Sequence, residues 1–354
     1  MKTQIIKINR ENFSQEDIVF CAKVIRRGGV VVFPTETVYG VGCDFNNEKA
    51  MGRLREIKKR SVNKPFSVLI PQPELISNFS SSNNPSIYKL IDAFWPGPLT
   101  VVIPSKRGGP TIGIRMPNHK TALSLIEEAQ CAVAAPSANL EGNPPPLTCE
   151  EALRDLDGMV DVAIDGGKTD IGQASTVVSL ISDKPTILRP GSITKEEIDK
   201  AYYKKTILFV CTGNSCRSVM AEYLLRSRLR HREDVDIISG GTSVFLASSA
   251  SGETIAVLKE EGIDAAKHVS KPVTTMMLKK ADLIFVMTSV HRSQILERVP
   301  EVDQRVYLLK EFIDEYPGAK GDRDIPDPMG GSYPNYKHCI STIKEAINKI
   351  INLV

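Results

Sequence analysis

At residues 207–218 the sequence reads Ile207-Leu-Phe-Val-Cys211-Thr-Gly-Asn-Ser-Cys216-Arg217-Ser218. The first four residues are apolar and predict a buried strand, and the residues from Val219 onward predict a helix. A loop that leads from a strand into a helix directs backbone N–H groups at one spot, where the helix dipole adds positive potential. Gly213 permits the tight curve that such a loop needs. The stretch therefore predicts an anion-binding loop at the end of a buried strand in an α/β fold.

Two side chains of this loop have the chemistry of phosphoryl transfer. A guanidinium six residues after a cysteine can hold two phosphate oxygens at once. The positive field of the loop favours the thiolate, which is the nucleophilic form of cysteine. We therefore predict that Cys211 attacks phosphorus and that Arg217 binds the phosphate. The rest of the predicted phosphate loop consists of Thr212, Gly213, Asn214, Ser215, Cys216 and Ser218.

Displacement by a thiolate also requires a proton for the leaving group. Asp327, in the segment Asp324-Ile-Pro-Asp327-Pro328, comes after the last expected strand of the chain. A carboxylic acid on that loop can lie over the phosphate loop, and Asp327 is therefore predicted as the third catalytic residue.

The sequence around the loop alternates strands with helix-length segments. Expected strands are Ile207–Val210, Val235–Ser239, Asp282–Met287 and Arg305–Leu308. This alternation predicts a four-stranded parallel sheet flanked by helices. The change of pattern near Lys204–Lys205 predicts two domains, residues 1–203 and residues 204–354.

Residues 206–354 resemble the low-molecular-weight protein-tyrosine phosphatases, whose Cys-x-Gly-Asn-x-Cys-Arg-Ser loop and late Asp-Pro are both present. The resemblance implies that Cys211 is the nucleophile, that Arg217 binds phosphate and that Asp327 is the acid. It also implies that Asn214 and Ser218 brace the loop and that the domain needs no cofactor.

Two positions depart from the tyrosine-specific members of that family. Ser215 precedes the second loop cysteine, and Met329-Gly-Gly331 follows the Asp-Pro pair. Both features are similar to the bacterial protein-arginine phosphatases. The chemistry agrees, since a small polar side chain in the wall of the substrate site can hydrogen-bond a guanidinium. The resemblance therefore implies a phosphoprotein substrate, with phosphoarginine preferred and phosphotyrosine possible. Arsenate reductases share this fold but relay oxidation through further cysteines, and none occurs between Cys216 and Cys339.

The first half of the chain has the pattern of a mixed α/β domain. Expected strands are Val30–Phe33, Thr35–Val41, Thr100–Ile103, Thr111–Met116, Ala132–Ala135, Val160–Ile164 and Ser175–Leu180. Helices are expected after the capping residues Ser14, Asn47 and Thr194. The segment Glu48–Lys64 has seven basic and two acidic residues, whereas the whole chain has a formal charge of only +3. Such a cluster suits a polyphosphate or an RNA backbone.

Several weak motifs follow one another in a fixed order through this half. They are Pro34-Thr-Glu-Thr37-Val-Tyr39-Gly40, Lys58-Lys-Arg60-Ser-Val-Asn-Lys64-Pro65, Trp95-Pro-Gly-Pro-Leu-Thr100, Ile114-Arg115-Met-Pro117, Pro136-Ser137-Ala-Asn139, Ala174-Ser175-Thr176 and Arg189-Pro-Gly191. As a series they resemble the threonylcarbamoyl-adenylate synthase (YrdC-like) family from about Ile5 to Ile198. That family has a twisted mixed sheet with a large open groove.

The resemblance implies a reaction that joins L-threonine, bicarbonate and ATP, with Mg²⁺ accompanying the ATP. The product serves tRNA threonylcarbamoyladenosine modification, so that tRNA is a partner only indirectly, through other modification proteins. The implied ATP-binding residues are Lys58, Arg60, Lys64, Thr111, Ser137, Asn139 and Arg189. The implied threonine-binding residues are Thr37, Arg115 and Ser175, and no protein metal ligands are implied.

Composition sets the remaining expectations. A length of 354 residues favours two domains, and no apolar run approaches the roughly 18 residues of a membrane span. Seven cysteines without an export signal favour the reducing cytoplasm. The sequence therefore predicts a bifunctional cytoplasmic enzyme that does not contact membranes. Two alternatives stay open: an RNA-binding first domain without catalysis, and arsenate reduction by the second.

Overall fold

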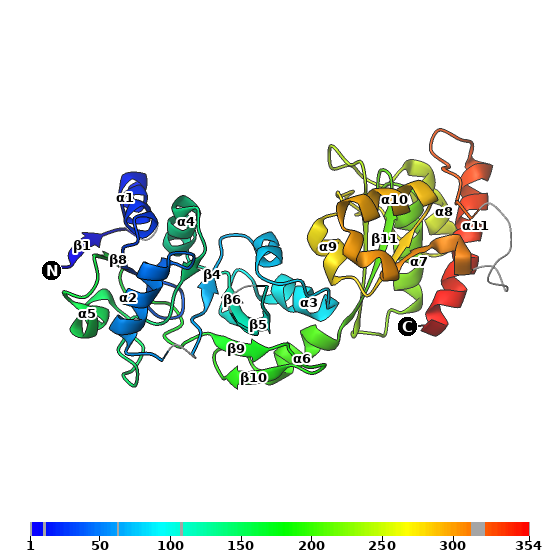
Figure 1. Cartoon of the computed structure of the whole chain (residues 1–354). Coiled ribbons are helices and arrows are strands. Elements are labelled where there is room, and N and C mark those ends of the chain that lie inside the picture. Colours follow the sequence, from blue (N-terminus) through cyan, green and yellow to red (C-terminus); the bar gives the residue numbers. More distant parts are fainter. Residues whose placement is uncertain (1, 10–11, 62–63, 107–108, 313–322, 354) are drawn as a thin grey trace. The chain divides into compact units, whose positions relative to one another are not determined.

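The computed structural model of the chain describes residues 2–9, 12–61, 64–106, 109–312 and 323–353. Its contacts divide the chain into two compact units. Unit 1 consists of Met1–Ser82 and Leu90–Tyr202, and unit 2 consists of Asn83–Lys89 and Tyr203–Val354. The two units are described separately below (Figure 1).

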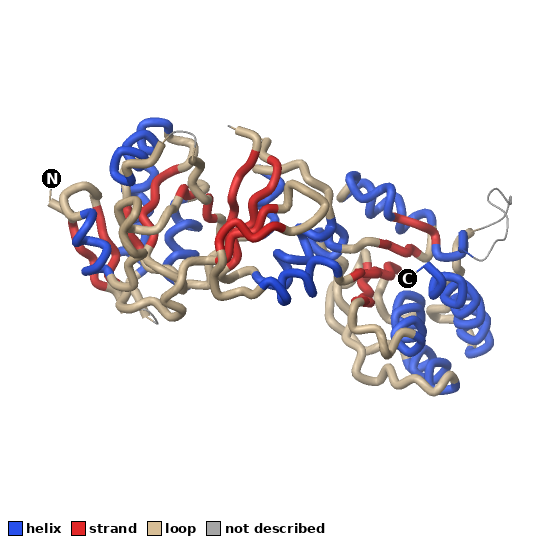
Figure 2. The backbone as a smooth tube through the Cα atoms, turned by 90° about the horizontal axis from the view of Figure 1, so that it is seen from below, coloured by secondary structure: helices blue, strands red, loops and turns tan. Residues whose placement is uncertain are grey.

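In the described part of unit 1, ten strands form one mixed sheet in the order β1-β8-β2-β3-β7-β4-β6-β5-β9-β10. Figure 2 shows the strands of the chain in red and the helices in blue. The strands are β1 Gln4–Lys7, β2 Val31–Phe33, β3 Gly40–Asp44, β4 Val68–Leu69, β5 Leu99–Pro104, β6 Thr111–Arg115, β7 Val133–Ala134, β8 Val162–Asp165, β9 Thr176–Ser179 and β10 Thr186–Arg189. Parallel pairs such as β1–β8 alternate with antiparallel pairs such as β2–β3. The predicted mixed sheet is confirmed.

The helices of the first half are α1 Gln15–Arg26, α2 Glu48–Lys58, α3 Pro85–Phe94, α4 Lys120–Ala129, α5 Cys149–Leu156 and α6 Lys195–Tyr203. Three of them begin where capping residues were expected. The Ser14 hydroxyl accepts the N–H of Glu16, and the Asn47 side chain accepts the N–H of Ala50. At α6, Thr194 and Glu197 each accept the other's backbone N–H, which is a complete capping box.

One expected strand is shorter than the sequence pattern suggested. The alternation over Thr35–Val41 predicted a strand, but β3 begins only at Gly40. The Thr35 hydroxyl accepts the backbone N–H groups of Thr37 and Val38 and donates to the carbonyl of Val38. These local hydrogen bonds replace strand pairing, so the segment becomes a loop.

Two apolar layers cover the two faces of the sheet around β2. Val30 and Val32 pack with the layer beneath α2 and α5, and Val31 and Phe33 pack with the layer of α1 and α4. Every residue of β2 is therefore buried, as its continuous apolar run requires.

Unit 2 has the predicted parallel sheet, with β11 Lys205–Cys211, β12 Val235–Gly241, β13 Leu283–Val286 and β14 Val306–Leu308. Its strand order is β12-β11-β13-β14, and all three pairings are parallel. The helices are α7 Arg217–Arg228, α8 Gly252–Glu260, α9 Thr275–Lys280, α10 Ser289–Arg298 and α11 Tyr333–Ile350. One buried layer joins the sheet to α7, α8 and α11, and the other joins it to α9 and α10.

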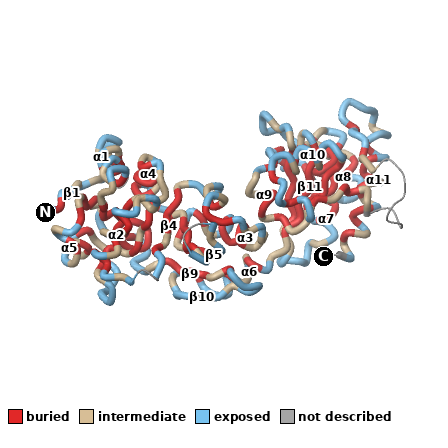
Figure 3. Tube along the Cα trace, in the orientation of Figure 1, coloured by how far each residue is buried: buried red, intermediate tan, exposed pale blue. Residues whose placement is uncertain are grey.

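The central strand β11 is buried along almost its whole length (Figure 3). Because β11 and β13 are parallel neighbours, their carboxyl ends lie at the same end of the sheet, where the loops that follow them can hold a site. In the described part of the chain, none of the helices is long and apolar enough to cross a membrane.

Candidate active sites

The phosphate loop of unit 2 joins the last residue of β11, Cys211, to the first residue of α7, Arg217. Its backbone is held by the segment after β12, because the carbonyls of Cys211, Thr212 and Ser215 accept N–H groups from residues 242, 243 and 251. Asn214 adopts a left-handed conformation with φ of 50°, which asparagine tolerates better than most residues. The predicted loop residues are thus held together at the N-terminus of α7.

Cys211 is only 3% exposed, and its sulfur lies 3.0 Å from the hydroxyl of Ser218. Ser218 Oγ also accepts a hydrogen bond from the side-chain amide of Asn214. A hydroxyl that donates to the sulfur stabilises a thiolate, and the helix N-terminus adds to this effect. The geometry suits a nucleophilic thiolate.

The guanidinium of Arg217 is held between the loop and the Asp-Pro segment. Nη1 donates to the carbonyl of Ile325 at 3.1 Å, and Nη2 forms an ion pair with the Asp327 carboxylate. The Nε of Arg217 is buried and has no hydrogen-bond partner among the described residues. A bound phosphate would give this Nε a partner and would compete with Asp327, whose side chain is 46% exposed. The ion pair therefore brings the acid and the phosphate-binding residue to the same place.

Sequence reasoning missed His291, at the start of α10. Its Nε2 lies 2.9 Å from the Thr212 hydroxyl, and its Nδ1 lies 2.8 Å from the Thr288 hydroxyl. Burial, with a smaller contribution from the charge of Arg217, lowers the pKa of His291 to about 4. His291 is thus a neutral ring that holds the Thr212 side chain of the phosphate loop. His291 comes shortly after β13, so its position near the carboxyl end of that strand was the only feature of the sequence that could have indicated a role at the site.

The pKa of His291 predicts a pH-dependent stability. The unfolded chain binds a proton on this ring near pH 6.5, whereas the folded chain binds it only near pH 4. The unfolding free energy contributed by the neutral ring is therefore complete above pH 6.5 and falls by about 3 kcal/mol as the pH drops to 4. Denaturant unfolding of His291→Gln between pH 7 and pH 4 should show a smaller pH dependence than wild type. The exposed His338→Gln is the control, and equal pH dependence in all three proteins would contradict the prediction.

Two further cysteines, Cys216 and Cys339, lie in the same buried layer as Cys211. The Cys216 sulfur lies 3.5 Å from Ser251 Oγ and 3.9 Å from the Tyr336 hydroxyl. Cys339 packs in the same buried layer, where burial raises the pKa of its thiol to about 12. A thiol that stays protonated is a poor resolving group, which favours hydrolysis over arsenate reduction.

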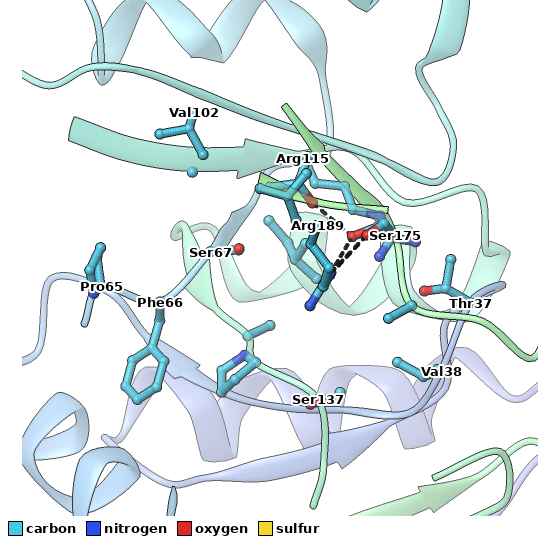
Figure 4. Close-up of a pocket in the computed structure, with 18 of the residues that line it drawn as sticks. Thr37, Val38, Pro65, Phe66, Ser67, Val102, Arg115, Ser137, Ser175 and Arg189 are labelled. Carbon is cyan, nitrogen blue, oxygen red and sulfur yellow. Dashed lines mark hydrogen bonds between the residues drawn. The ribbon is translucent and has the colours of Figure 1, made fainter. Parts of the chain in front are cut away.

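Unit 1 contains a cavity of about 440 Å³ at the open face of its sheet (Figure 4). Among the described residues, the cationic side chains that line it are Arg60, Lys64, Arg115 and Arg189, and no Asp or Glu among them lines it. Hydroxyl residues that line it include Thr37, Thr111, Ser137 and Ser175. Eight of the ten residues implied for ATP and threonine therefore meet at one cavity, which has the electrostatics of an anion site.

Arg115 reaches the cavity from the end of β6. Its Nη2 lies 2.7 Å from Glu36 Oε1, and its Nε donates to the carbonyl of Gly97 at 3.1 Å. Both charged side chains are almost completely buried, at 8% and 5% exposure. Glu36 does not line the cavity, so it supports Arg115 from behind. No sequence pattern predicted that Glu36 pairs with Arg115; Glu36 only lies within one of the quoted motifs, between Thr35 and Thr37.

Arg189 and Ser175 are hydrogen-bonded neighbours in the lining of the cavity, as Figure 4 shows. The guanidinium of Arg189 donates to the carbonyl of Ser175 at 2.9 Å and to its hydroxyl at 3.0 Å. That hydroxyl also lies 2.9 Å from Thr100 Oγ1. Desolvation, followed by the charges of Arg115 and Arg60, lowers the pKa of Arg189. Three arginine side chains thus share one positive region.

Two of the implied ATP residues lie behind the cavity wall. The Lys58 ammonium is buried, and it donates to the carbonyls of Ser137 and Asn139. Asn139 Oδ1 in turn accepts the hydroxyl of Ser137 at 2.5 Å. Neither Lys58 nor Asn139 lines the cavity, so both support Ser137, which does. Burial lowers the pKa of Lys58 to about 8.

No group of three His, Cys, Asp or Glu side chains in the described part of the chain is placed to hold a metal ion. The prediction of Mg²⁺ therefore rests only on ATP, whose triphosphate binds that ion, and we assign no reaction step to the metal.

Comparisons with known proteins match each half of the chain to a different family. The family model described as "Telomere recombination" (Sua5, YciO and YrdC proteins) matches residues 23–191, and the model "Low molecular weight phosphotyrosine protein phosphatase" matches residues 206–354. Threonylcarbamoyl-AMP synthase of Bacillus subtilis strain 168 is 41% identical over 191 residues, which are 51% of this chain and 55% of that protein. The match thus spans little more than half of the Bacillus protein.

A second relative matches over more of its length. Threonylcarbamoyl-AMP synthase of Pyrococcus abyssi is 35% identical over 268 residues, covering 73% of this chain and 78% of that protein. The crystal structure of P. abyssi Sua5 complexed with L-threonine is 27% identical with a TM-score of 0.55, covering 86% of this chain and 99% of that one.

The fold and the two sites thus define a chain that combines two classes of enzyme, a nucleotidyltransferase and a phosphate hydrolase. The chain belongs to the threonylcarbamoyl-AMP synthase (Sua5/YciO/YrdC) family, and its residues 206–354 form a low-molecular-weight phosphatase domain.

Proposed function

We propose that unit 1 forms threonylcarbamoyl-AMP and pyrophosphate from L-threonine, bicarbonate and ATP. The observation that supports this most is the cavity whose described lining has four cationic side chains, several hydroxyls and no carboxylate. The L-threonine complex of the P. abyssi relative supports the choice of amino acid. The product would supply the threonylcarbamoyl modification of tRNA through other proteins.

The cavity suits the chemistry of this reaction. A carbamate formed on threonine attacks the α-phosphorus of ATP through oxygen, and pyrophosphate leaves. Arg60, Lys64 and Arg189 would stabilise the charge that develops on the phosphates. Arg115 would bind the carboxylate of threonine, and the hydroxyls of Thr37 and Ser175 would bind its polar groups.

Arg115→Ala is expected to weaken threonine use more than ATP use. Loss of a buried charge-assisted contact costs about 1.5–3 kcal/mol, or roughly ten- to hundredfold in the apparent affinity for threonine. Initial rates of pyrophosphate release measured against each substrate test this. Arg154→Ala, which removes an arginine from an exposed pair with Glu150, is the control. An unchanged threonine KM in Arg115→Ala would remove Arg115 from the threonine site.

We further propose that unit 2 hydrolyses phosphoproteins through a cysteinyl-phosphate. The Cys211 sulfur attacks phosphorus while Arg217 holds the phosphate oxygens, and Asp327 gives its proton to the leaving group. Water then gives a proton to the Asp327 carboxylate and attacks the phosphorus of the cysteinyl-phosphate, the S–P bond breaks, the thiolate is restored and inorganic phosphate leaves. The approach of all three residues at the end of β11 supports this assignment.

Phosphoarginine is the proposed preferred substrate. Ser215 Oγ contacts only the Cys216 sulfur, at 3.6 Å, among the described residues, so its hydroxyl has capacity left for a guanidinium. Matched phosphoarginine and phosphotyrosine peptides, assayed side by side by phosphate release, test the preference. Ser215→Val should shift the ratio of kcat/KM toward phosphotyrosine, because an apolar wall packs against a phenol ring. Faster hydrolysis of phosphotyrosine by the wild type would contradict the proposal.

All seven cysteines are free in the structure, which supports the proposed location in a reducing cytoplasm.

A further inference from the structure

Glu36 is a buried carboxylate in unit 1 that has a single cationic partner among the described residues. Its side chain is 5% exposed, and its Oε1 lies 2.7 Å from Nη2 of Arg115, whose side chain is 8% exposed. Neither oxygen of this carboxylate accepts a hydrogen bond from a described residue. Breaking a buried ion pair is costly, because each charge would then be left without a partner and without water. The two charges therefore stay together.

The backbone around Glu36 holds this carboxylate in place. The carbonyl of Glu36 accepts the N–H of Ile171 at 2.8 Å, and the hydroxyls of its two neighbours, Thr35 and Thr37, lie 2.9 Å apart. Both threonines line the cavity, whereas Glu36 does not. The carboxylate therefore acts on a ligand through the guanidinium of Arg115 and not by direct contact.

The guanidinium of Arg115 has one nitrogen left for a ligand. Its Nε donates to the carbonyl of Gly97 at 3.1 Å, and its Nη2 is paired with Glu36. Within the described part of the chain, Nη1 has no hydrogen bond or ion pair, and Arg115 is part of the cavity lining. A ligand in the cavity would therefore meet Arg115 at Nη1.

The other cations of the cavity have no buried carboxylate against them among the described residues. Arg60 and Arg189 donate to neutral carbonyl and hydroxyl groups. Lys64 pairs with Glu141 at 2.8 Å, but these side chains are 60% and 40% exposed, so water and salt screen the pair. The charge of Arg115 is thus offset far more completely than the charges of the other three.

This distribution of charge divides the cavity into two kinds of anion site. The three cations without a buried carboxylate suit a polyphosphate. At the Arg115–Glu36 pair the charges sum to zero, so a ligand gains the hydrogen bonds of Nη1 but little net Coulomb attraction. A guanidinium without such a partner would attract a phosphate dianion more strongly than a carboxylate, because Coulomb energy grows with the charge of the ligand.

We propose that Glu36 is a specificity-determining residue of the threonine subsite, where it offsets the charge of Arg115 and so makes the subsite select a carboxylate over a phosphate. The phosphates of ATP and pyrophosphate are left to the other three cations. This inference rests on the proposed synthase function and on the binding of the threonine carboxylate by Arg115.

The experiment compares two ligands that differ in the charge of one group. They are L-threonine and the aminophosphonate in which a phosphonate replaces its carboxylate. Calorimetric titration of the full-length protein, at a pH where the phosphonate is a dianion, gives both dissociation constants. The wild type should bind threonine more tightly. In Glu36→Gln, whose amide oxygen can still accept from Nη2, the ratio of the phosphonate to the threonine dissociation constant should fall at least about tenfold.

Two further variants separate the charge from the structure. Glu36→Gln/Arg115→Met restores a sum of zero, so it should weaken the binding of both ligands but return the ratio to within about threefold of wild type. Glu141→Gln is the matched control, because it removes a carboxylate from the exposed pair with Lys64. Its ratio should also stay within about threefold of wild type.

An unchanged ratio in Glu36→Gln, or an equal fall in the variant that also lacks Arg115, would overturn the proposal. If Glu36→Gln does not fold, the wild type still tests the idea, because phosphonate binding as tight as threonine binding would contradict the selection of a carboxylate. Failure of the proposed synthase function would be recognised separately, since the wild type would then neither bind threonine nor release pyrophosphate in its presence.

Discussion

Cys211→Ser is expected to abolish phosphate release from phosphopeptides, by at least about 10⁴-fold in kcat. The serine hydroxyl is not ionised near neutral pH, so the positive field of the phosphate loop no longer produces a nucleophile. Phosphate binding should persist, because Arg217 and the loop backbone are unchanged. Phosphate release and phosphopeptide binding by the same preparation measure the two effects.

The same protein should retain the synthase activity proposed for unit 1. Cys131→Ser is the matched control, since Cys131 is a half-buried cysteine that lines neither candidate site. Residual phosphatase activity of Cys211→Ser within tenfold of wild type would show that the hydrolysis does not proceed through this sulfur.

Asp327→Asn is expected to lower kcat by about 10²–10⁴-fold on substrates with poor leaving groups. An amide cannot give a proton to the departing nitrogen or oxygen. The loss should be much smaller on an aryl phosphate whose leaving group needs no proton. Because the substitution also removes the carboxylate paired with Arg217, KM should stay equal or fall.

Initial rates on both classes of substrate check this prediction. Asp324→Asn is the control, since Asp324 lies on the same segment but accepts hydrogen bonds from Ser289. Equal losses on good and poor leaving groups would mean that Asp327 only orients Arg217 and does not transfer the proton.

The sequence predicted the parts of the structure that depend on short segments. The strands β11, β13 and β14 of unit 2 contain continuous apolar runs between helix-length segments, and the spacing of Cys211 and Arg217 lies within a single loop. The capping residues Ser14, Asn47 and Thr194 likewise act on N–H groups at most three residues away.

The missed features depend on partners that are distant in sequence. His291 contacts Thr212, which is 79 residues away in the sequence. Glu36 pairs with Arg115, and no sequence pattern connects these two residues. Short strands such as β4 Val68–Leu69 have too few residues to show alternation. The ATP-binding role of Lys58 stays a prediction, and its contacts with the carbonyls of Ser137 and Asn139 were not predicted, because a motif gives the position of a residue in sequence but not the direction of its side chain.

The most direct test of the bifunctional assignment is pyrophosphate release from ATP by the Cys211→Ser protein, which has no phosphatase nucleophile. We expect release that requires both L-threonine and bicarbonate, accompanied by an equal amount of threonylcarbamoyl-AMP, and strongly reduced in Arg60→Ala. Pyrophosphate release without threonine, or none under any condition while the protein binds RNA, would contradict the assignment of unit 1 as a synthase.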